Sequence, residues 1–155
     1  MSNPNERQVG GEHYKRHTYQ HWDLAVNVQM NYLEGYSTKY LARWREKGGP
    51  EDLEKVVHII QKLRSVSDKV PRTSNLSIGT ILIEVSKYAL ANNLPTPETL
   101  ITRYLACWDT DEDLRIAEET AVELLEQAKR EFSAKPVPLT EENHHAERFQ
   151  YDDRT

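Results

Sequence analysis

The residues Gly48, Gly49 and Pro50 separate two stretches of the chain that both have helical periodicity. Two glycines followed by a proline do not continue a helix at low cost, because glycine loses much backbone entropy and proline lacks an amide hydrogen. Pro50 is suited to the first turn of a new helix, where that amide is not needed. Glu51 and Asp52 follow it in the first turn of the new helix, where the positive end of the helix dipole favours carboxylates. The sequence therefore predicts a hairpin of two helices with its turn at this point.

Apolar residues recur with helical spacing over most of the chain, and no stretch alternates as a β-strand does. Gly35 is expected to end the first helix and to act as a hinge, and Thr96 to cap the fifth. The expected helices cover residues 22–33, 36–47, 50–63, 78–91 and 97–108, and a long last helix opens at 109–113 and reaches Phe132. The fold class is therefore all-α, a compact bundle of about five to six helices with a flexible N-terminal arm and a flexible C-terminal tail.

The length and composition predict one main domain. A chain of 155 residues with 37% hydrophobic residues is long enough to bury a core of its own. We expect a helical module at residues 11–66, a second helical region packed on it at 76–133, and a flexible tail at 134–155. Three tryptophans and eight tyrosines in a polar chain leave aromatic surface to cover, so a homo-oligomer is expected.

Charge and cysteine content exclude several classes of protein. The net charge of -5 argues against binding of bulk nucleic acid, which requires a broadly basic surface. The single cysteine, Cys107, has no partner for an internal disulfide and is expected to be a buried structural thiol. No apolar run approaches the ~20 residues that cross a bilayer, and the N-terminus lacks the apolar core of a signal peptide. We therefore expect a cytoplasmic protein without a membrane partner.

Residues 36–47 combine cations and aromatic rings on one expected helix. The cations Lys39, Arg43 and Lys47, which we call the basic stripe, recur every four residues, and Tyr36, Tyr40 and Trp44 follow the same step on an adjoining strip. Residues four apart lie one turn apart on the same side of a helix. Arginine and lysine bind phosphate through charge-assisted hydrogen bonds, and ring faces suit a base. A phosphate-binding surface is one interpretation, and an ordinary solvated helix face is the other.

Other polar residues allow a functional and a structural interpretation. Asp52 either orients a ligand hydroxyl or acts as a base, or else it only stabilises a helix start. The pair His13-Tyr14 follows two glycines, so the arm is able to fold over the helix pair and present an imidazole to a ligand, or it merely packs there. His13, His17 and His21 recur every fourth residue, but no carboxylate or cysteine completes a metal site, and we assign no metal ligand.

The acidic residues of the last helix superficially resemble those of all-α nucleotide pyrophosphohydrolases, which hold magnesium between carboxylates. They do not reproduce the expected Glu-Glu-x-x-Glu spacing, which favours a solvated helix face. The residues concerned are Glu118, Glu119, Glu123 and Glu126.

A spaced pattern across residues 11–65, about a third of the chain, resembles a family of small bacteriophage proteins. Many members are described only as uncharacterised or as nucleotide kinase, and the pattern also looks like the C-terminal module of the nucleotide kinase of T-seven-like phages. Where the family has Gly-Asn before the basic helix, this chain has Gly35-Tyr36. The matching residues are His13-Tyr14, Gln20, Asp23, Gly35, Lys39-Tyr40, Arg43, Lys47-Gly48-Gly49, Asp52-Leu53, Lys55 and His58.

The resemblance implies a nucleotide-binding protein similar to a nucleoside monophosphate kinase, acting in the cytoplasm of an infected bacterium. No cofactor is assigned, and magnesium is expected only in company with a nucleotide. The chain has no Gly-x-x-x-x-Gly-Lys-Ser/Thr loop, so a kinase would work without the usual phosphate cradle. The implied nucleotide-binding residues are His13, Tyr14, Lys39, Tyr40, Arg43 and Lys47, and the implied catalytic residues are Asp52 and Arg43.

Three further functions stay open at this stage. The first is a non-catalytic sponge that sequesters a nucleotide signal of host defence, and the second is a nucleotide pyrophosphohydrolase. The third is an interaction protein whose basic stripe binds an acidic partner. If the chain binds a nucleotide, replacing Lys39 or Arg43 by alanine is expected to abolish binding without unfolding the protein.

Overall fold

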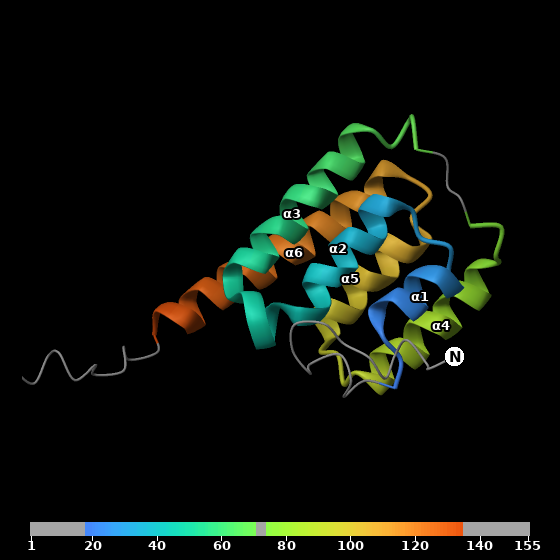
Figure 1. Cartoon of the computed structure of the whole chain (residues 1–155). Coiled ribbons are helices and arrows are strands. Elements are labelled where there is room, and N and C mark those ends of the chain that lie inside the picture. The colour runs from blue at the N-terminus through green and yellow to red at the C-terminus, as the bar shows by residue number, and fades with distance from the viewer. Residues whose placement is uncertain (1–17, 71–73, 135–155) are drawn as a thin grey trace, which may run out of the picture.

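The computed structural model describes residues 18–70 and 74–134, and all the regular structure within these ranges is helical (Figure 1). The all-α class is thereby confirmed. The predicted N-terminal arm with His13 and Tyr14, and the predicted tail after residue 134, lie outside the described residues. The elements are α1 (His21–Asn27), α2 (Tyr32–Arg43), the π-helical η3 (Trp44–Gly48), α3 (Gly49–Ser65), α4 (Ile78–Ala91), α5 (Thr96–Cys107) and α6 (Asp111–Ser133).

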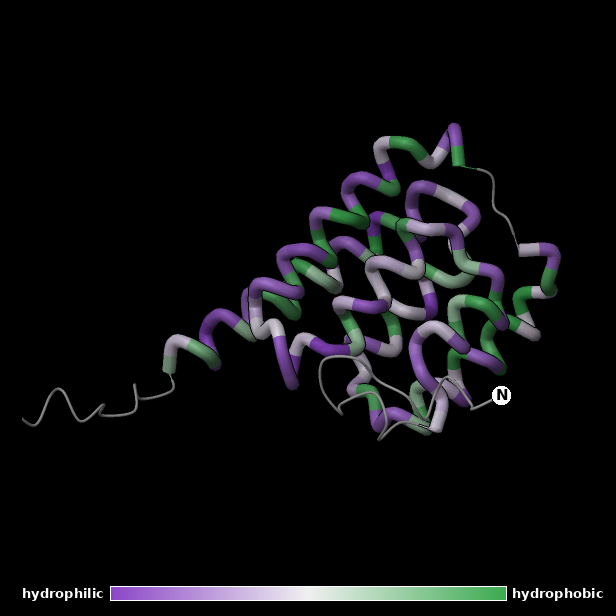
Figure 2. The backbone as a smooth tube through the Cα atoms, in the orientation of Figure 1, coloured by the Kyte–Doolittle hydropathy of each residue, from purple (hydrophilic) through white to green (hydrophobic). Residues whose placement is uncertain are grey.

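Four helices enclose the main core. The two longest, α3 and α6, run side by side, with α2 packed on α3 and α5 packed on α6 (Figure 1). Hydrophobic and hydrophilic residues alternate along these helices in Figure 2, as expected when each helix buries one side. The expected apolar sides of the third and sixth helices are buried, except that Phe132 is 39% exposed. The core residues include Leu41, Trp44, Leu53, Ile60, Leu105, Leu114, Ala121 and Leu124.

A second, smaller apolar cluster lies between α1, α4 and α5. Leu24 of α1 and Val28, directly after α1, pack there against Ile81 and Val85 of α4. Tyr19 links the same elements, because its hydroxyl donates to Glu84 Oε2 at 2.6 Å. The edge position of α4 leaves its outer side in contact with solvent.

The single helix expected at residues 22–33 is wrong, because the chain breaks after Asn27. Gln29 has a positive φ of 59°, and Asn31 caps a new helix by accepting hydrogen bonds from the amides of Leu33 and Glu34 at 2.9 and 3.0 Å. This cap starts α2 before Gly35, which therefore lies inside the helix and is neither a stop nor a hinge.

The predicted hairpin turn is confirmed, with a local feature that the sequence does not show. The chain passes from α2 into the π-helical η3, and α3 begins at Gly49. Gly49 has φ of +55°, a conformation that favours glycine, and its α-carbon faces the ring of Phe132 on α6. A β-carbon at this position would lie 3.0 Å from that ring, so glycine also allows the close approach of α6.

Two tryptophan–glutamate hydrogen bonds join α2 and α5 at opposite ends. Trp44, the first residue of η3 directly after α2, donates to Glu98 Oε1 near the start of α5 at 3.0 Å. Trp108, at the end of α5, donates to Glu34 Oε1 near the start of α2 at 2.6 Å. All four side chains are buried. The two bonds therefore hold α2 and α5 antiparallel.

The start of α5 differs by one residue from the expected one. Pro95, and not Thr96, occupies the N-cap position, and no side chain caps the helix. At α1, α2 and α6 an acidic side chain three residues after the cap binds the amide of the cap residue. Proline has no amide hydrogen, so Glu98 has no such partner and turns to Trp44 instead.

Candidate functional site

A groove lies between α2 and α3, and of the predicted site residues only Tyr40 is among those that the structure shows lining it. It encloses about 740 Å³, open solvent at its mouth included. The side of α2 supplies two tyrosine rings, and the side of α3 supplies charged residues and an apolar floor. The lining residues are Tyr36, Tyr40, Glu51, Glu54, Lys55, His58 and Ile59.

Three tyrosines form a ladder along α2 because they recur every four residues. The rings of Tyr32 and Tyr36 stack with their centroids 5.3 Å apart, and the rings of Tyr36 and Tyr40 meet edge to face at 5.0 Å. The hydroxyls of Tyr36 and Tyr40 share a hydrogen bond of 2.9 Å, which raises the pKa of Tyr36. The Tyr36 phenol is therefore neutral near pH 7, and the two rings present an aromatic wall.

Three cations surround the ring of Tyr40. Arg43 Cζ lies 4.7 Å from the ring centroid, Lys55 Nζ 5.3 Å and Lys39 Nζ 5.6 Å. Such distances fall within the range of cation–π attraction. The predicted association of cations with aromatic rings thus exists, and α3 contributes Lys55 to it.

Asp52 is buried beneath this cluster and both of its oxygens have partners. Arg43 donates from Nε to Oδ2 at 2.8 Å and from Nη2 to Oδ1 at 3.2 Å, and Lys55 Nζ lies 3.3 Å from Oδ1. Asp52 is only 1% exposed. A β-carbon at Gly48 would lie 1.9 Å from this carboxylate, so glycine makes room for it. These contacts are those of a structural ion pair, and the catalytic roles implied for Asp52 and Arg43 stay predictions.

The basic stripe is divided by the structure. Arg43 binds Asp52, Lys47 is exposed in η3, and none of the three stripe residues is among the lining residues of the groove. Lys39 lies over the rings of Tyr36 and Tyr40, and it makes no ion pair with a carboxylate in ranges 18–70 and 74–134. Lys39 is therefore the member of the stripe whose charge is most available to a ligand beside the rings.

Lys55 carries a compensated charge. Its ammonium lies 2.7 Å from Glu51 Oε1 as well as near Asp52. The hydrogen bond to Glu51 is the main reason why the pKa of Lys55 is raised, so this side chain is charged at neutral pH. Lys55 and His58 belong to the expected helix 50–63. Their spacing of four and seven residues from Glu51 is the sequence signal that places them on the same side of α3, facing the groove.

His21 on α1 is electrostatically coupled to the basic stripe. Burial, followed by the positive charges of Lys39 and Arg43, lowers its pKa from 6.5 to about 4, while Asp23 opposes this shift. His21 is therefore neutral near pH 7. The sequence singled it out only as a metal candidate with His13 and His17, which lie outside the described residues. No group of three or more metal-binding side chains occurs in the part of the chain that the structure describes.

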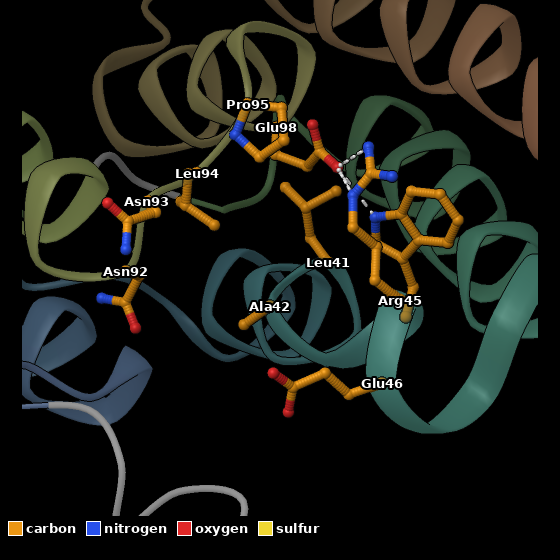
Figure 3. A pocket seen from close by; sticks show the side chains of 10 residues that line it. Leu41, Ala42, Arg45, Glu46, Asn92, Asn93, Leu94, Pro95 and Glu98 are labelled. Atoms are coloured by element: carbon orange, nitrogen blue, oxygen red, sulfur yellow. Dashed lines mark hydrogen bonds and ion pairs between the residues drawn. The ribbon is translucent and has the colours of Figure 1, made fainter.

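A second hollow of about 510 Å³ lies where the end of α2 meets the loop before α5 (Figure 3). Glu98 lines it and accepts hydrogen bonds from Trp44 and, at 2.9 Å, from Arg45 Nε. Arg45 also packs over the Trp44 ring, with Cζ 4.2 Å from its centroid. None of the predicted site residues lines this hollow. We interpret it as a consequence of the packing between α2 and α5.

Two arginines bind four of the acidic residues of α6. Arg64 of α3 binds Glu118 at 2.6 Å and Asp111 at 2.8 Å, and Arg115 binds Glu119 and Glu112 on α6 itself. The two Arg64 pairs hold the end of α3 to the start of α6. They supply no carboxylate cluster for magnesium among the described residues.

Comparisons with known proteins identify no relative. No protein-family description, curated protein or solved structure matches this chain. The resemblance to the bacteriophage family therefore stays a prediction that rests on the sequence pattern. Among the described helices, none combines the length and the apolar character needed to cross a bilayer.

Proposed function

We propose that the groove between α2 and α3 binds a nucleotide. The base packs against the rings of Tyr36 and Tyr40, and the phosphate binds the ammonium of Lys39. The observation that carries this proposal is the position of Lys39, which lies 5.4 and 5.6 Å from the two ring centroids and has no carboxylate partner in ranges 18–70 and 74–134. A cation without an anion, beside two ring faces, suits a ligand that is both aromatic and negatively charged.

The expected affinity is moderate. A charge-assisted hydrogen bond contributes ~1.5–3 kcal/mol and stacking of a base on an aromatic ring ~1–3 kcal/mol. The groove is open, so part of this gain is offset by the cost of association. We expect a dissociation constant between about 1 μM and 1 mM at low salt, weakening as salt is added.

Calorimetry with a panel of nucleoside monophosphates and diphosphates tests the proposal. Lys39→Ala is expected to weaken binding at least tenfold, and Tyr40→Ala to weaken it while Tyr40→Phe does not, because the ring face is what binds. Lys62→Ala is the matched control, since Lys62 is an exposed lysine of α3 outside the groove. Absence of binding to every nucleotide, or equal affinity in wild type and Lys39→Ala, would overturn the proposal.

The ion pair between Arg43 and Asp52 supports binding of a nucleotide without catalysis, that is, sequestration. Phosphoryl transfer needs charged groups that act on the transferring phosphate. Here the two residues implied as catalytic bind each other, and Asp52 is 1% exposed. On this proposal the protein retains a nucleotide unchanged, as a phage-encoded sponge for a signal of host defence would.

Incubation with radiolabelled nucleotide separates sequestration from catalysis. A sponge returns the original nucleotide after denaturation, whereas a kinase in the presence of a phosphate donor returns a phosphorylated one. A pyrophosphohydrolase returns a monophosphate and requires magnesium, so the same assay with a chelator identifies it. A converted product in wild type that is absent from Asp52→Asn would establish catalysis and refute sequestration.

A further inference from the structure

The outer side of α4 carries a line of residues with the spacing of a helix–helix interface. These residues, Gly79, Ile83, Ser86 and Leu90, follow one another at intervals of four, three and four. This is the spacing at which one helix contacts a neighbour along its length. All four are exposed, Leu90 by 79% and Ile83 by 58%. We call this line the α4 seam.

No contact within residues 18–70 and 74–134 requires glycine at position 79. A β-carbon built there has Ser77 Oγ at 3.8 Å as its nearest contact, which is an ordinary van der Waals distance. Gly48 and Gly49 differ, because their own chain crowds them. Glycine is less favourable than alanine in a helix, and no contact between Gly79 and the rest of the described chain offsets this cost. The small size of Gly79 therefore points to a close approach from outside the chain.

The α4 seam is complementary to itself in antiparallel orientation. When two copies of α4 cross about a twofold axis, Gly79 of one copy faces Leu90 of the other, and Ile83 faces Ser86. Each large side chain meets a small one, and both contacts occur twice, as a twofold interface requires. In a parallel pair Leu90 would face Leu90 and Gly79 would face Gly79, which leaves a gap at one end.

Charges and polar groups on α4 do not oppose this pairing. Its two charged residues bind each other, with Lys87 Nζ 2.7 Å from Glu84 Oε1. The hydroxyl of Ser86 donates to the carbonyl of Leu82 at 2.8 Å, so its burial leaves no unsatisfied donor. The seam is therefore electrically neutral and mostly apolar, as the centre of an interface between identical subunits is.

We infer that α4 is a self-association surface that binds the α4 of a second copy of this chain in antiparallel orientation. A helix of 14 residues is about 21 Å long and about 10 Å wide. One such face offers on the order of 200–400 Å², below the ~800 Å² per partner of a standard interface. The dimer is accordingly weak and exchanges rapidly. The seam lies apart from the groove between α2 and α3, so this inference does not depend on nucleotide binding.

Sedimentation equilibrium between about 10 μM and 1 mM protein tests the inference. Wild type is expected to associate to a dimer over this range, and Leu90→Ser to lower the association constant at least tenfold, because an aliphatic side chain is lost from each copy. Val26→Ser is the matched control, since Val26 of α1 is 75% exposed and lies outside the seam. A wild type that stays monomeric at 1 mM, or equal association of wild type and Leu90→Ser, would overturn the inference.

Gly79→Ala separates interface effects from folding effects. Among the described residues the added methyl group makes only an ordinary van der Waals contact with Ser77 Oγ, so the melting temperature at low concentration should be unchanged or raised. In the dimer the same methyl group occupies the space taken by Leu90 of the other copy, so association should weaken. If Gly79→Ala associates as well as wild type does, the proposed close approach at Gly79 is refuted.

Disulfide cross-linking tests the orientation in a Cys107→Ser background, which removes the native thiol. Chains carrying Ile83→Cys and chains carrying Ser86→Cys are oxidised separately and as a mixture. An antiparallel dimer is expected to cross-link mainly in the mixture, because Ile83 faces Ser86. Cross-linking mainly within each variant alone would show a parallel pair and overturn the proposed orientation.

Discussion

The ion pair between Arg43 and Asp52 joins the end of α2 to the start of α3. Its carboxylate is 1% exposed and its guanidinium 19%, so neither charge is fully hydrated. Burial of a charge is tolerated only where partners replace its water, and Arg43 does this with two hydrogen bonds. Gly48 belongs to the same arrangement, since any larger residue would displace the carboxylate.

Arg43→Ala is expected to destabilise the fold by about 2–4 kcal/mol, because it leaves the Asp52 carboxylate buried with Lys55 as its remaining partner. Urea unfolding followed by circular dichroism measures the change. The double variant Arg43→Met with Asp52→Asn should recover part of the loss, since it removes the buried charge. A cost below about 0.5 kcal/mol for Arg43→Ala would show that the pair does not stabilise the fold. Because Arg43→Ala is expected to destabilise the fold, a loss of binding in this variant would not identify Arg43 as a ligand contact. Lys39→Ala is therefore the better test of nucleotide binding.

His21 makes stability depend on pH. Its pKa is lowered from 6.5 to about 4 in the folded protein, so between these values the unfolded chain binds more protons. The free energy of unfolding should therefore fall as the pH drops from about 6.5 towards 4, by at most about 1.4 kcal/mol per pH unit from this group. Above pH 6.5 its contribution is constant. Unfolding curves of wild type and His21→Gln across this range check the prediction, and identical slopes would contradict it.

The same histidine reports on the charge of Lys39. Burial is the largest cause of its lowered pKa, and the positive charge of Lys39 comes next. Lys39→Ala should therefore raise the pKa of His21, and so should a bound phosphate group that neutralises Lys39. A proton NMR titration of the imidazole measures both shifts. Lys62→Ala should leave the pKa unchanged, and an equal shift in that variant would refute the assignment to Lys39.

At the scale of the elements, α2 is held at both ends. A capping box at Asn31 and Glu34 starts it, and the π-helical η3 ends it. The acidic residue of the cap is also the acceptor for Trp108, so one carboxylate both starts α2 and binds the end of α5. At the other end η3 positions Trp44 and Arg45 on Glu98.

Trp44→Phe and Trp108→Phe are each expected to destabilise the protein by about 1–3 kcal/mol, because each removes a donor from a buried carboxylate. The two sites lie at opposite ends of a 12-residue helix, about 18 Å apart, so their effects should add within about 0.5 kcal/mol. Denaturant unfolding of both single variants and the double variant measures this. Trp22→Phe is the control, since Trp22 is 43% exposed. A neutral Trp108→Phe would contradict the prediction.

At the scale of the whole molecule, one core unites the two regions expected from the sequence. Leu53 and Ile60 of α3 pack in the same cluster as Leu105 of α5 and Leu124 of α6. Neither the described part of the first region, residues 18–66, nor residues 76–133 therefore bury their apolar sides alone. The two regions are expected to fold as one unit.

Unfolding should accordingly be a single two-state transition. Far-ultraviolet circular dichroism, which follows all helices, and tryptophan fluorescence, which follows mainly Trp44 and Trp108 in the core, should give the same midpoint. Leu105→Ala should lower the free energy of unfolding by about 2–5 kcal/mol. The midpoints of both signals should move together. Separate midpoints for the two signals would show that the regions unfold independently.

The amino-acid sequence by itself determined the helical class, the hairpin turn and the buried sides of α3 and α6. These features follow from local causes, namely the 3.6-residue repeat and the conformations open to Gly48, Gly49 and Pro50. The association of cations and tyrosines at residues 36–43 was predictable for the same reason, because both lie on one helix.

Only the tertiary structure decided which of these residues are available to a ligand. Arg43 is bound to Asp52, Lys55 and His58 reach the groove from α3, and Lys39 alone lies over the rings without a carboxylate partner among the described residues. The bonds that fix α2 against α5 join residues 54 and 74 positions apart in the chain. No local pattern encodes such pairs, because the partner of a buried charge depends on which helices the core brings together.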